Sequence, residues 1–269
     1  MIRFALLFVC LVPSVVLAQA PPGPQPFRIT DNSFLVEEAF NQEKGIFQNI
    51  FGGTHVNGAW AASFTQEWPV KSQTHQFSYT VAWLESNRTS GAGDVLLNYR
   101  YQAMTEGPGR PAFSPRASLV LPTGNSRRGF GGGSLGLQLN LPFSKQTGDW
   151  YWHWNAGLTW LPNAHAMVPQ GEARHEDLAS PFLAGSAIYR LRPMFNLMLE
   201  SFLSFDEIID DVATERSRGF TLSPGARGGW DLGEKQLVLG LAFPTTWRGG
   251  ESATGVFVYC SYELPFSGS

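Results

Sequence analysis

The chain has 269 residues and a formal net charge of -3, and only 15% of its residues are charged, well below the usual fraction of about 25%. Binding to nucleic acid requires clustered Lys and Arg, so this charge balance excludes nucleic acid as an expected partner. Hydrophobic residues make up 43% of the chain, and no segment after the N-terminus has ~18 consecutive apolar residues, which excludes both a disordered chain and a helical membrane protein.

The N-terminus has the pattern of a secretory signal peptide. Arg3 supplies a short positive region, and an uncharged apolar run continues from it to Leu17. The small residues around Ala18 are suited to cleavage, so residues 1–18 are predicted to be a signal peptide. The protein is therefore expected to leave the cytoplasm.

After the signal peptide, residues 19–32 are predicted to be a flexible lead-in, because they contain the proline-rich stretch PPGPQP. The folded part is predicted to be residues 33–269. Of the two cysteines, Cys10 lies within the signal peptide, so the mature chain keeps only Cys260 and forms no internal disulfide.

Strict alternation of apolar and polar residues recurs along the folded part. In the stretch DWYWHWNAGLTWLP, which covers residues 149–162, Trp150, Trp152 and Trp154 share one parity, and His153 and Asn155 share the other. A period of two is the period of a β-strand, whose successive side chains point to opposite faces. Each such strand has one very apolar face and one mostly polar face.

Alternation and turn residues together predict about twelve strands, within a range of 10 to 14. We expect them near residues 44–53, 58–70, 74–85, 93–104, 112–121, 130–143, 150–162, 179–191, 194–206, 218–231, 235–247 and 254–266. The connections after odd-numbered strands include three long or glycine-rich polar ones, Glu85–Gly93, Asn163–Leu178 and Glu207–Gly219. Several opposite connections are tight, as in Arg192-Pro193. Long loops on one side and short turns on the other are typical of a transmembrane β-barrel.

The apolar faces could pack in the core of a soluble β protein or contact lipid. Aromatic residues concentrate near strand ends, as Trp60, Trp83, Trp160 and Trp247 illustrate, and such rings favour the membrane interface. The expected fold is all-β, a closed antiparallel transmembrane β-barrel of the outer membrane. A soluble periplasmic β protein is the alternative.

Three stretches resemble a known family: NSFLVEEAFNQEKG (Asn32–Gly45), GAGDVLLNYRYQ (Gly91–Gln102) and SPRASLVLPTGNSRRGFGGGSLG (Ser114–Gly136). They are similar to the outer-membrane proteins named for the MetA pathway of phenol degradation, whose members are often labelled "transporter". The resemblance implies a Gram-negative outer-membrane barrel. It also implies, less directly, passage of small hydrophobic or aromatic molecules.

Charged residues on the polar parity are the candidate pore-lining residues, because a charge that faces lipid is costly. They are Glu67, Arg100, Arg116, Glu200 and Arg227. Two interpretations stay open. Either the charges pair with one another and fill the lumen, or the three arginines form a cationic constriction that selects anions.

Other motifs give no site. Gly132-Gly133-Ser134-Leu135-Gly136 matches G-x-S-x-G, but no helix is expected after it, so no catalytic serine is predicted. His165 and His175 lie in a predicted loop without tight ligand spacing, so neither a metal nor a cofactor is expected. An enzyme that modifies lipid would need a Ser-His or Asp-His set at the lipid-facing rim, and the sequence does not assemble one.

The predicted function is therefore an outer-membrane channel or transporter for small molecules, and not an enzyme. The alternatives are a structural barrel or one that binds through its loops, and, less favoured, the enzyme that modifies lipid. The expected partners are outer-membrane lipid and lipopolysaccharide, with Arg127 and Arg128 as candidates for its phosphates. The barrel-assembly machinery is expected to bind the C-terminal strand, which ends near Phe266. The solute is left open.

Overall fold

The computed structural model describes residues 27–29, 31–86, 89–167, 173–209 and 214–266. The predicted signal peptide and the first part of the predicted lead-in lie outside these ranges. Within them, no helix is long and apolar enough to cross a membrane, and the short 3-10 turn η1 (Ser126–Arg128) is the one helical element.

The fold is a single antiparallel sheet of 16 strand segments. They are β1 (Ile46–Val56), β2 (Ala59–Val70), β3 (Ser72–Ser86), β4 (Thr89–Ala92), β5 (Val95–Tyr101), β6 (Ala112–Phe113), β7 (Arg116–Leu121), β8 (Gly136–Thr147), β9 (Trp150–Met167), β10 (Ala173–Arg192), β11 (Phe195–Ile209), β12 (Thr214–Leu232), β13 (Lys235–Ala242), β14 (Thr245–Arg248), β15 (Glu251–Thr254) and β16 (Val256–Pro265).

The sheet closes on itself. Each strand pairs with its neighbour along the wall, and β1 pairs antiparallel with β16 to complete the ring. Four spans are each interrupted once, between β4 and β5, β6 and β7, β13 and β14, and β15 and β16, so the segments form 12 spans. The predicted closed antiparallel barrel of about twelve strands is confirmed. Closure pairs the strands around the ring, as a sheet that faces lipid requires; near the loop end the pairing of β10 with β11 stops at Phe182 and Ser204.

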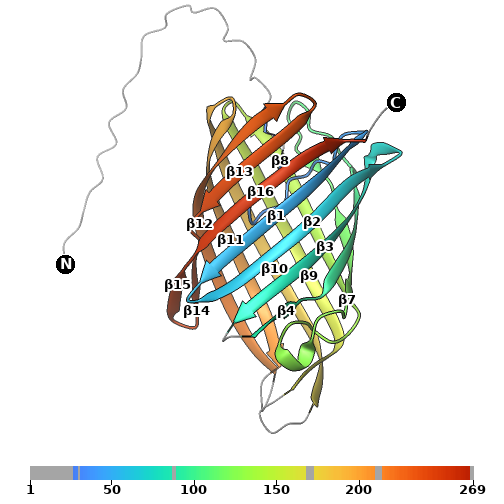
Figure 1. Cartoon of the computed structure of the whole chain (residues 1–269), viewed down its shortest axis with the longest axis vertical. Helices are drawn as coiled ribbons and strands as arrows, with labels where there is room; N and C mark the ends of the chain where they lie inside the picture. The colour runs from blue at the N-terminus through green and yellow to red at the C-terminus, as the bar shows by residue number, and fades with distance from the viewer. Residues whose placement is uncertain (1–26, 30, 87–88, 168–172, 210–213, 267–269) are drawn as a thin grey trace, which may run out of the picture.

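The two ends of the barrel differ (Figure 1). At one end, here called the terminal end, the chain enters β1 and leaves β16, and tight turns such as the one at Gly233 (φ 72°) join the strands. The opposite end, here called the loop end, carries the longer hairpins. The stretch Asn163–Leu178, predicted to be a loop, is mostly strand, because β9 and β10 stay paired as far as Met167 and Ala173.

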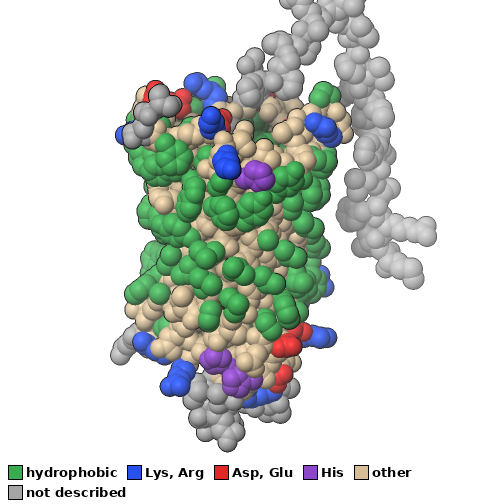
Figure 2. All heavy atoms as spheres, turned by 90° about the vertical axis from the view of Figure 1, so that its right-hand side faces the viewer, with side chains coloured by type: hydrophobic (Ala, Val, Ile, Leu, Met, Phe, Trp, Pro, Cys, Tyr) green, Lys and Arg blue, Asp and Glu red, His purple; other side chains and the backbone are tan. Residues whose placement is uncertain are grey.

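The strands alternate as predicted. On the outer face Leu139, Trp152 and Trp154 are 53%, 41% and 41% exposed, whereas His153 and Asn155 on the other parity are 2% and 4% exposed. Figure 2 shows the outer side chains as a broad apolar belt, with charged residues gathered at the two ends. This is the surface that a barrel needs in order to face hydrocarbon.

The described residues before β1, 27–29 and 31–45, run inside the barrel; we call them the lumen segment. Phe27, Ile29 and Asp31 are at most 5% exposed. This differs from the expectation of a flexible lead-in followed by a barrel from residue 33, since the barrel wall starts at Ile46. The lumen segment and the side chains that hold it form the candidate functional site.

Candidate functional site

Apolar side chains of the lumen segment are seated in hollows of the wall. The Phe34 ring lies over Gly240, where an added Cβ would be 2.2 Å from its Cζ atom, and it also approaches Gly225. Ile29 packs with Val238 and its neighbours, and Phe27 packs with Tyr151 at a ring-centroid distance of 5.0 Å. The lumen segment is therefore fitted to this wall and does not merely occupy the space inside it.

Wall side chains satisfy the backbone of the lumen segment, which has no regular secondary structure. The Glu200 carboxylate accepts hydrogen bonds from the backbone N–H groups of Leu35 (2.9 Å) and Val36 (3.2 Å). Asn155 binds both backbone groups of Glu37: its Oδ1 accepts from the N–H at 2.8 Å, and its Nδ2 donates to the carbonyl at 2.9 Å. Buried backbone groups need such partners, so each of these side chains fixes the position of the lumen segment.

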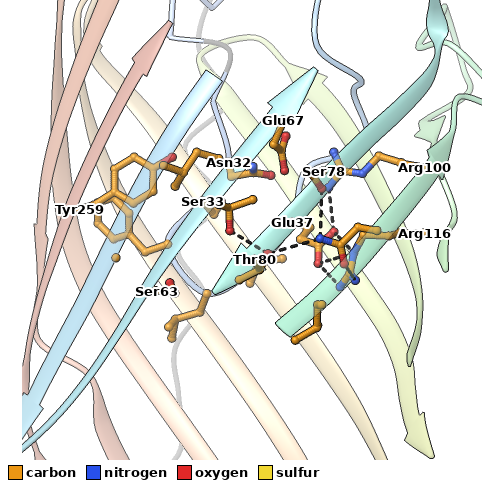
Figure 3. Close-up of a pocket in the computed structure, with 18 of the residues that line it drawn as sticks. Asn32, Ser33, Glu37, Ser63, Glu67, Ser78, Thr80, Arg100, Arg116 and Tyr259 are labelled. Atoms are coloured by element: carbon orange, nitrogen blue, oxygen red, sulfur yellow. Dashed lines mark hydrogen bonds and ion pairs between the residues drawn. The ribbon is translucent and has the colours of Figure 1, made fainter. Parts of the chain in front are cut away.

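The carboxylate of Glu37 is held by two arginines from neighbouring strands (Figure 3). Arg116 on β7 donates from Nη2 to Oε1 at 2.6 Å and from Nε to both oxygens, and Arg100 on β5 donates from Nη2 to Oε2 at 2.7 Å. The guanidinium of Arg116 also reaches Asn98 and Gln138 of the wall. Glu37 thus links β9, through its backbone, with β5 and β7, through its side chain, across one part of the lumen; we call this link the Glu37 crossing.

Arg227 on β12 binds the lumen segment through backbone oxygens. Its Nη1 donates to the carbonyls of Asp31 and Asn32, each at 2.7 Å. The carboxylate of Asp31 accepts instead from Tyr259 Oη at 2.6 Å and from Ser261 Oγ, both on β16. A second link, between the nearby strands β12 and β16, therefore lies nearer the start of the lumen segment.

All five predicted pore-lining residues, Glu67, Arg100, Arg116, Glu200 and Arg227, face the lumen, and all but Arg116 are nearly fully buried. Neither predicted arrangement describes them. Within the described residues Glu67 accepts from Gln76 and Glu200 from backbone N–H groups, so neither carboxylate forms a salt bridge with the arginines. Their role in selecting solutes stays a prediction.

Sequence reasoning missed Glu37 and Asp31. Both lie in a stretch without alternation, which gave no sign that it runs inside the barrel. The one available signal was the family resemblance of Asn32–Gly45, which marked the stretch as part of the protein's characteristic sequence without giving its position.

Two neighbouring carboxyl groups of the lumen segment have opposite pKa shifts. Burial raises the pKa of Glu37, but the positive charges of Arg116 and Arg100 and their hydrogen bonds outweigh it and lower the pKa to about 2. Burial and the nearby Asp31 raise the pKa of Glu38 to about 8. Glu37 is therefore ionised and paired at neutral pH, whereas Glu38 holds its proton.

Space remains on the loop side of the Glu37 crossing. A cavity of about 300 Å³ lies between the lumen segment and hydroxyl-bearing residues of β2 and β3, among them Ser63 and Thr80, and a second of about 290 Å³ lies beside Thr159 and Ser180. A third cavity of about 290 Å³, at the loop end, is mainly apolar and is lined by residues that include Val56, Leu84 and Phe130.

Two of the three stretches that carry the family resemblance, Gly91–Gln102 and Ser114–Gly136, contribute to the mouth of the barrel at the loop end. The carboxylate of Asp94 accepts from the backbone N–H groups of Gly124 (2.9 Å) and Gly132 (2.8 Å), which fastens the β7–β8 connection to β5. This connection buries the ring of Phe130 against Gly91. The glycine-rich motif is therefore a loop that shapes the mouth, as its lack of a following helix indicated.

A Ser-His pair does occur inside the barrel. Ser144 Oγ and His153 Nδ1 are 2.7 Å apart, and Ser144 also accepts from the backbone N–H of Ala39. Ser144 is fully buried, His153 is 2% exposed, and the Nε2 atom of His153 has no hydrogen-bond partner in the described part of the chain. The pair anchors the lumen segment and lies away from the lipid-facing rim where a lipid substrate would arrive.

These features define a class: a 12-stranded barrel of the outer-membrane type whose lumen is crossed by the residues before its first strand. The family model described as "Putative MetA-pathway of phenol degradation" matches residues 26–248, and the chain belongs to that family. The predicted resemblance is confirmed. No curated protein matches the chain.

Solved structures share the fold. The COG4313 outer membrane channel from Pseudomonas putida F1 is 13% identical, with a TM-score of 0.62 over 84% of this chain and 97% of that one. The NanC porin is 10% identical, with a TM-score of 0.52 over 81% of this chain and 100% of that one. At these identities the likeness establishes the architecture alone.

Proposed function

We propose that the protein is an outer-membrane channel for small molecules and that its lumen segment is the closure of that channel. The observation that carries the proposal is the Glu37 crossing, which ties the lumen segment to β9, β5 and β7 inside the barrel. The family membership and the channels among the similar structures support the same function.

The lining of the cavities favours a class of solute. The cavity at the loop end is apolar, with Val56, Leu84 and Phe130 in its wall, and the next cavity presents the hydroxyls of Ser63 and Thr80. A small aromatic molecule with one or two hydroxyl groups would satisfy both surfaces in turn, because ring burial is favourable in the first and hydrogen bonding in the second. This class also fits a family named for phenol degradation.

The experiment is planar-bilayer recording together with liposome swelling in phenol, resorcinol and a sugar of similar size. We compare the unaltered protein, a variant without residues 27–44, and Glu37→Ala, which leaves the chain length unchanged. Both variants should conduct more than the unaltered protein, and the hydroxylated aromatics should pass faster than the sugar.

Leu199→Ala is the matched control, because Leu199 faces outward on β11 and touches no lumen residue of the site. It should leave conductance unchanged. If the deletion and Glu37→Ala both keep the conductance of the unaltered protein, the lumen segment is not the closure and the proposal fails.

A further inference from the structure

We propose that a groove on the outer wall, along β10 near the loop end, binds the phosphorylated headgroup and one acyl chain of lipid A, the membrane part of lipopolysaccharide. The proposal rests on the outer-membrane location proposed above. It concerns the lipid-facing surface and does not depend on what passes through the lumen.

The groove exists because β10 presents small side chains between two bulky neighbours. Ala179 and Pro181 face outward on β10, with Leu158 of β9 on one side and Phe205 of β11 on the other. The hollow between them has a volume of about 380 Å³. An apolar furrow of this kind, open to the hydrocarbon layer, accepts a length of acyl chain.

Pro181 also explains why the wall is open at this point. Proline has no backbone N–H, and the pairing of β10 with β11 ends at Phe182 and Ser204. Beyond that pair, the Glu207 carboxylate accepts from the backbone N–H of Ala179 at 2.8 Å, in place of a ladder bond. The two strands are thus linked by a side chain above the groove, while the groove itself stays unfilled.

Two arginines stand at the loop-end mouth of the groove. The guanidinium of Arg218 lies 5.8 Å above the centre of the Phe205 ring, and in the described part of the chain Arg218 has no carboxylate partner. Arg216 has an 86% exposed side chain, and its salt bridge with Glu207 uses only the Nε atom. A cation on the lipid-facing parity is stable beside water or an anion, so at the membrane surface this pair can bind an anionic headgroup.

The level of the two arginines fits a headgroup. On the same parity of β12, Phe220 lies next along the strand towards the membrane and stacks on Trp247 at a centroid distance of 5.9 Å, as expected for an aromatic girdle. Phosphate is the anion found at this level, and arginine binds it through paired N–H donors. The loop end faces the outer leaflet if the chain ends lie in the periplasm, and there the phosphates belong to lipid A.

Arg127 and Arg128, the earlier candidates for these phosphates, are placed differently. The guanidinium of Arg128 lies 5.6 Å from the centre of the Phe130 ring, which is buried in the mouth of the barrel. They therefore serve as the matched control pair, with the same charge at the same end of the barrel but away from the groove.

The test is native mass spectrometry of the full-length mature protein in detergent, titrated with bisphosphorylated lipid A. The double variant Arg216→Gln and Arg218→Gln should bind at least about tenfold more weakly, as expected from the loss of charge-assisted hydrogen bonds. Ala179→Phe, which fills the groove and changes no charge, should weaken binding as well. Arg127→Gln with Arg128→Gln should bind like the unaltered protein.

Dephosphorylated lipid A and phosphatidylglycerol are titrated in parallel, and both should bind more weakly than the bisphosphorylated form. Equal binding of phosphatidylglycerol would show a generic site for anionic lipid and overturn the proposal. A loss of affinity in the Arg127 and Arg128 pair, or none in the Arg216 and Arg218 pair, would overturn it too. None of these measurements involves conductance, so their outcome is independent of the channel proposal.

Discussion

At the scale of single residues, Glu37 is the group on which the lumen network depends. Its carboxylate forms salt bridges with both Arg100 and Arg116, and among the described residues neither guanidinium has another salt-bridge partner. Breaking a buried ion pair from one side costs more than the pair contributes, because the remaining charge is desolvated and unpaired. The two arginines thus make the presence of Glu37 energetically necessary.

We expect Glu37→Ala to lower the free energy of unfolding by about 3–5 kcal/mol, the range for removing one partner of a buried pair. Chemical denaturation of the detergent-solubilised protein measures it. Glu43→Ala is the control, because Glu43 is an exposed carboxylate of the same segment, and it should change the stability little. Equal losses in the two variants would contradict the assigned role of Glu37.

Glu38 should make the closure sensitive to alkaline pH. Its pKa is raised to about 8 by burial and by Asp31, and the other charges that face it are Arg227, Arg100 and Glu67. A carboxyl group whose pKa is raised by docking contributes its full stabilisation when the pH is below the ordinary pKa of glutamate. That contribution is lost as the pH rises through about 8. The closure should therefore weaken on the alkaline side.

Recording of channel openings between about pH 6 and about pH 9 tests this expectation. The unaltered protein should open more often as the pH rises, and Glu38→Gln, which keeps the neutral form, should flatten the profile. Glu43→Gln should keep the rise. A Glu38→Gln profile that matches the unaltered one would assign the pH response to another group.

At the scale of elements, the strands and the lumen segment are held by different means. A strand is held by its hydrogen-bond ladder and by its two faces, so its sequence shows a period of two. That period, together with the turn residues between strands, predicted about twelve spans. The boundary of β8 shifted from residue 130 to Gly136 because Phe130 turns into the mouth. The alternation of residues along a strand cannot predict such a tertiary contact.

The lumen segment could not be predicted in the same way. Its N–H groups find partners one by one on distant strands, Leu35 on Glu200 and Ala39 on Ser144, so no spacing within the segment repeats. The parity of Arg100, Arg116 and Arg227 correctly placed them in the lumen. The hydrogen-bond partners of these arginines could not be predicted, because they lie in the lumen segment, whose sequence shows no alternation.

The contact of the Phe34 ring with Gly240 allows a test of how the lumen segment is held against the wall. Gly240→Ala adds a Cβ 2.2 Å from the Phe34 ring, so the ring must move, and overpacking of this kind costs about 1–3 kcal/mol. We expect lower stability and more frequent channel openings. Gly185→Ala is the matched control, because the nearest contact of its Cβ is an ordinary 3.5 Å. Equal behaviour of the two variants would show that Phe34 does not hold the lumen segment.

At the scale of the whole molecule, the barrel separates two solvents. Side chains on the outer face contact hydrocarbon, and side chains on the inner face contact a polar lumen. Successive residues of a strand therefore lie in different environments. This makes the parity of every strand a testable property.

Leu139→Arg, on the outer face, should cost about 2–4 kcal/mol, the range for an arginine near the bilayer midplane. Thr159→Arg, on the inner face beside a cavity of about 290 Å³, should cost much less. Folding into lipid vesicles, followed by tryptophan fluorescence across a denaturant series, measures both. Equal costs would contradict the barrel orientation.

The lumen segment can also be regarded as a peptide ligand tethered to its own receptor. The tether holds it at an effective concentration in the millimolar range or above, so modest intrinsic affinity suffices to keep it bound. A synthetic peptide of residues 27–44 should therefore fail to compete with the unaltered protein, yet should block a barrel that lacks these residues when added at comparable concentration. The barrel wall would then act as a peptide-binding protein, and Glu200, Asn155 and Arg227 would determine which peptide it binds.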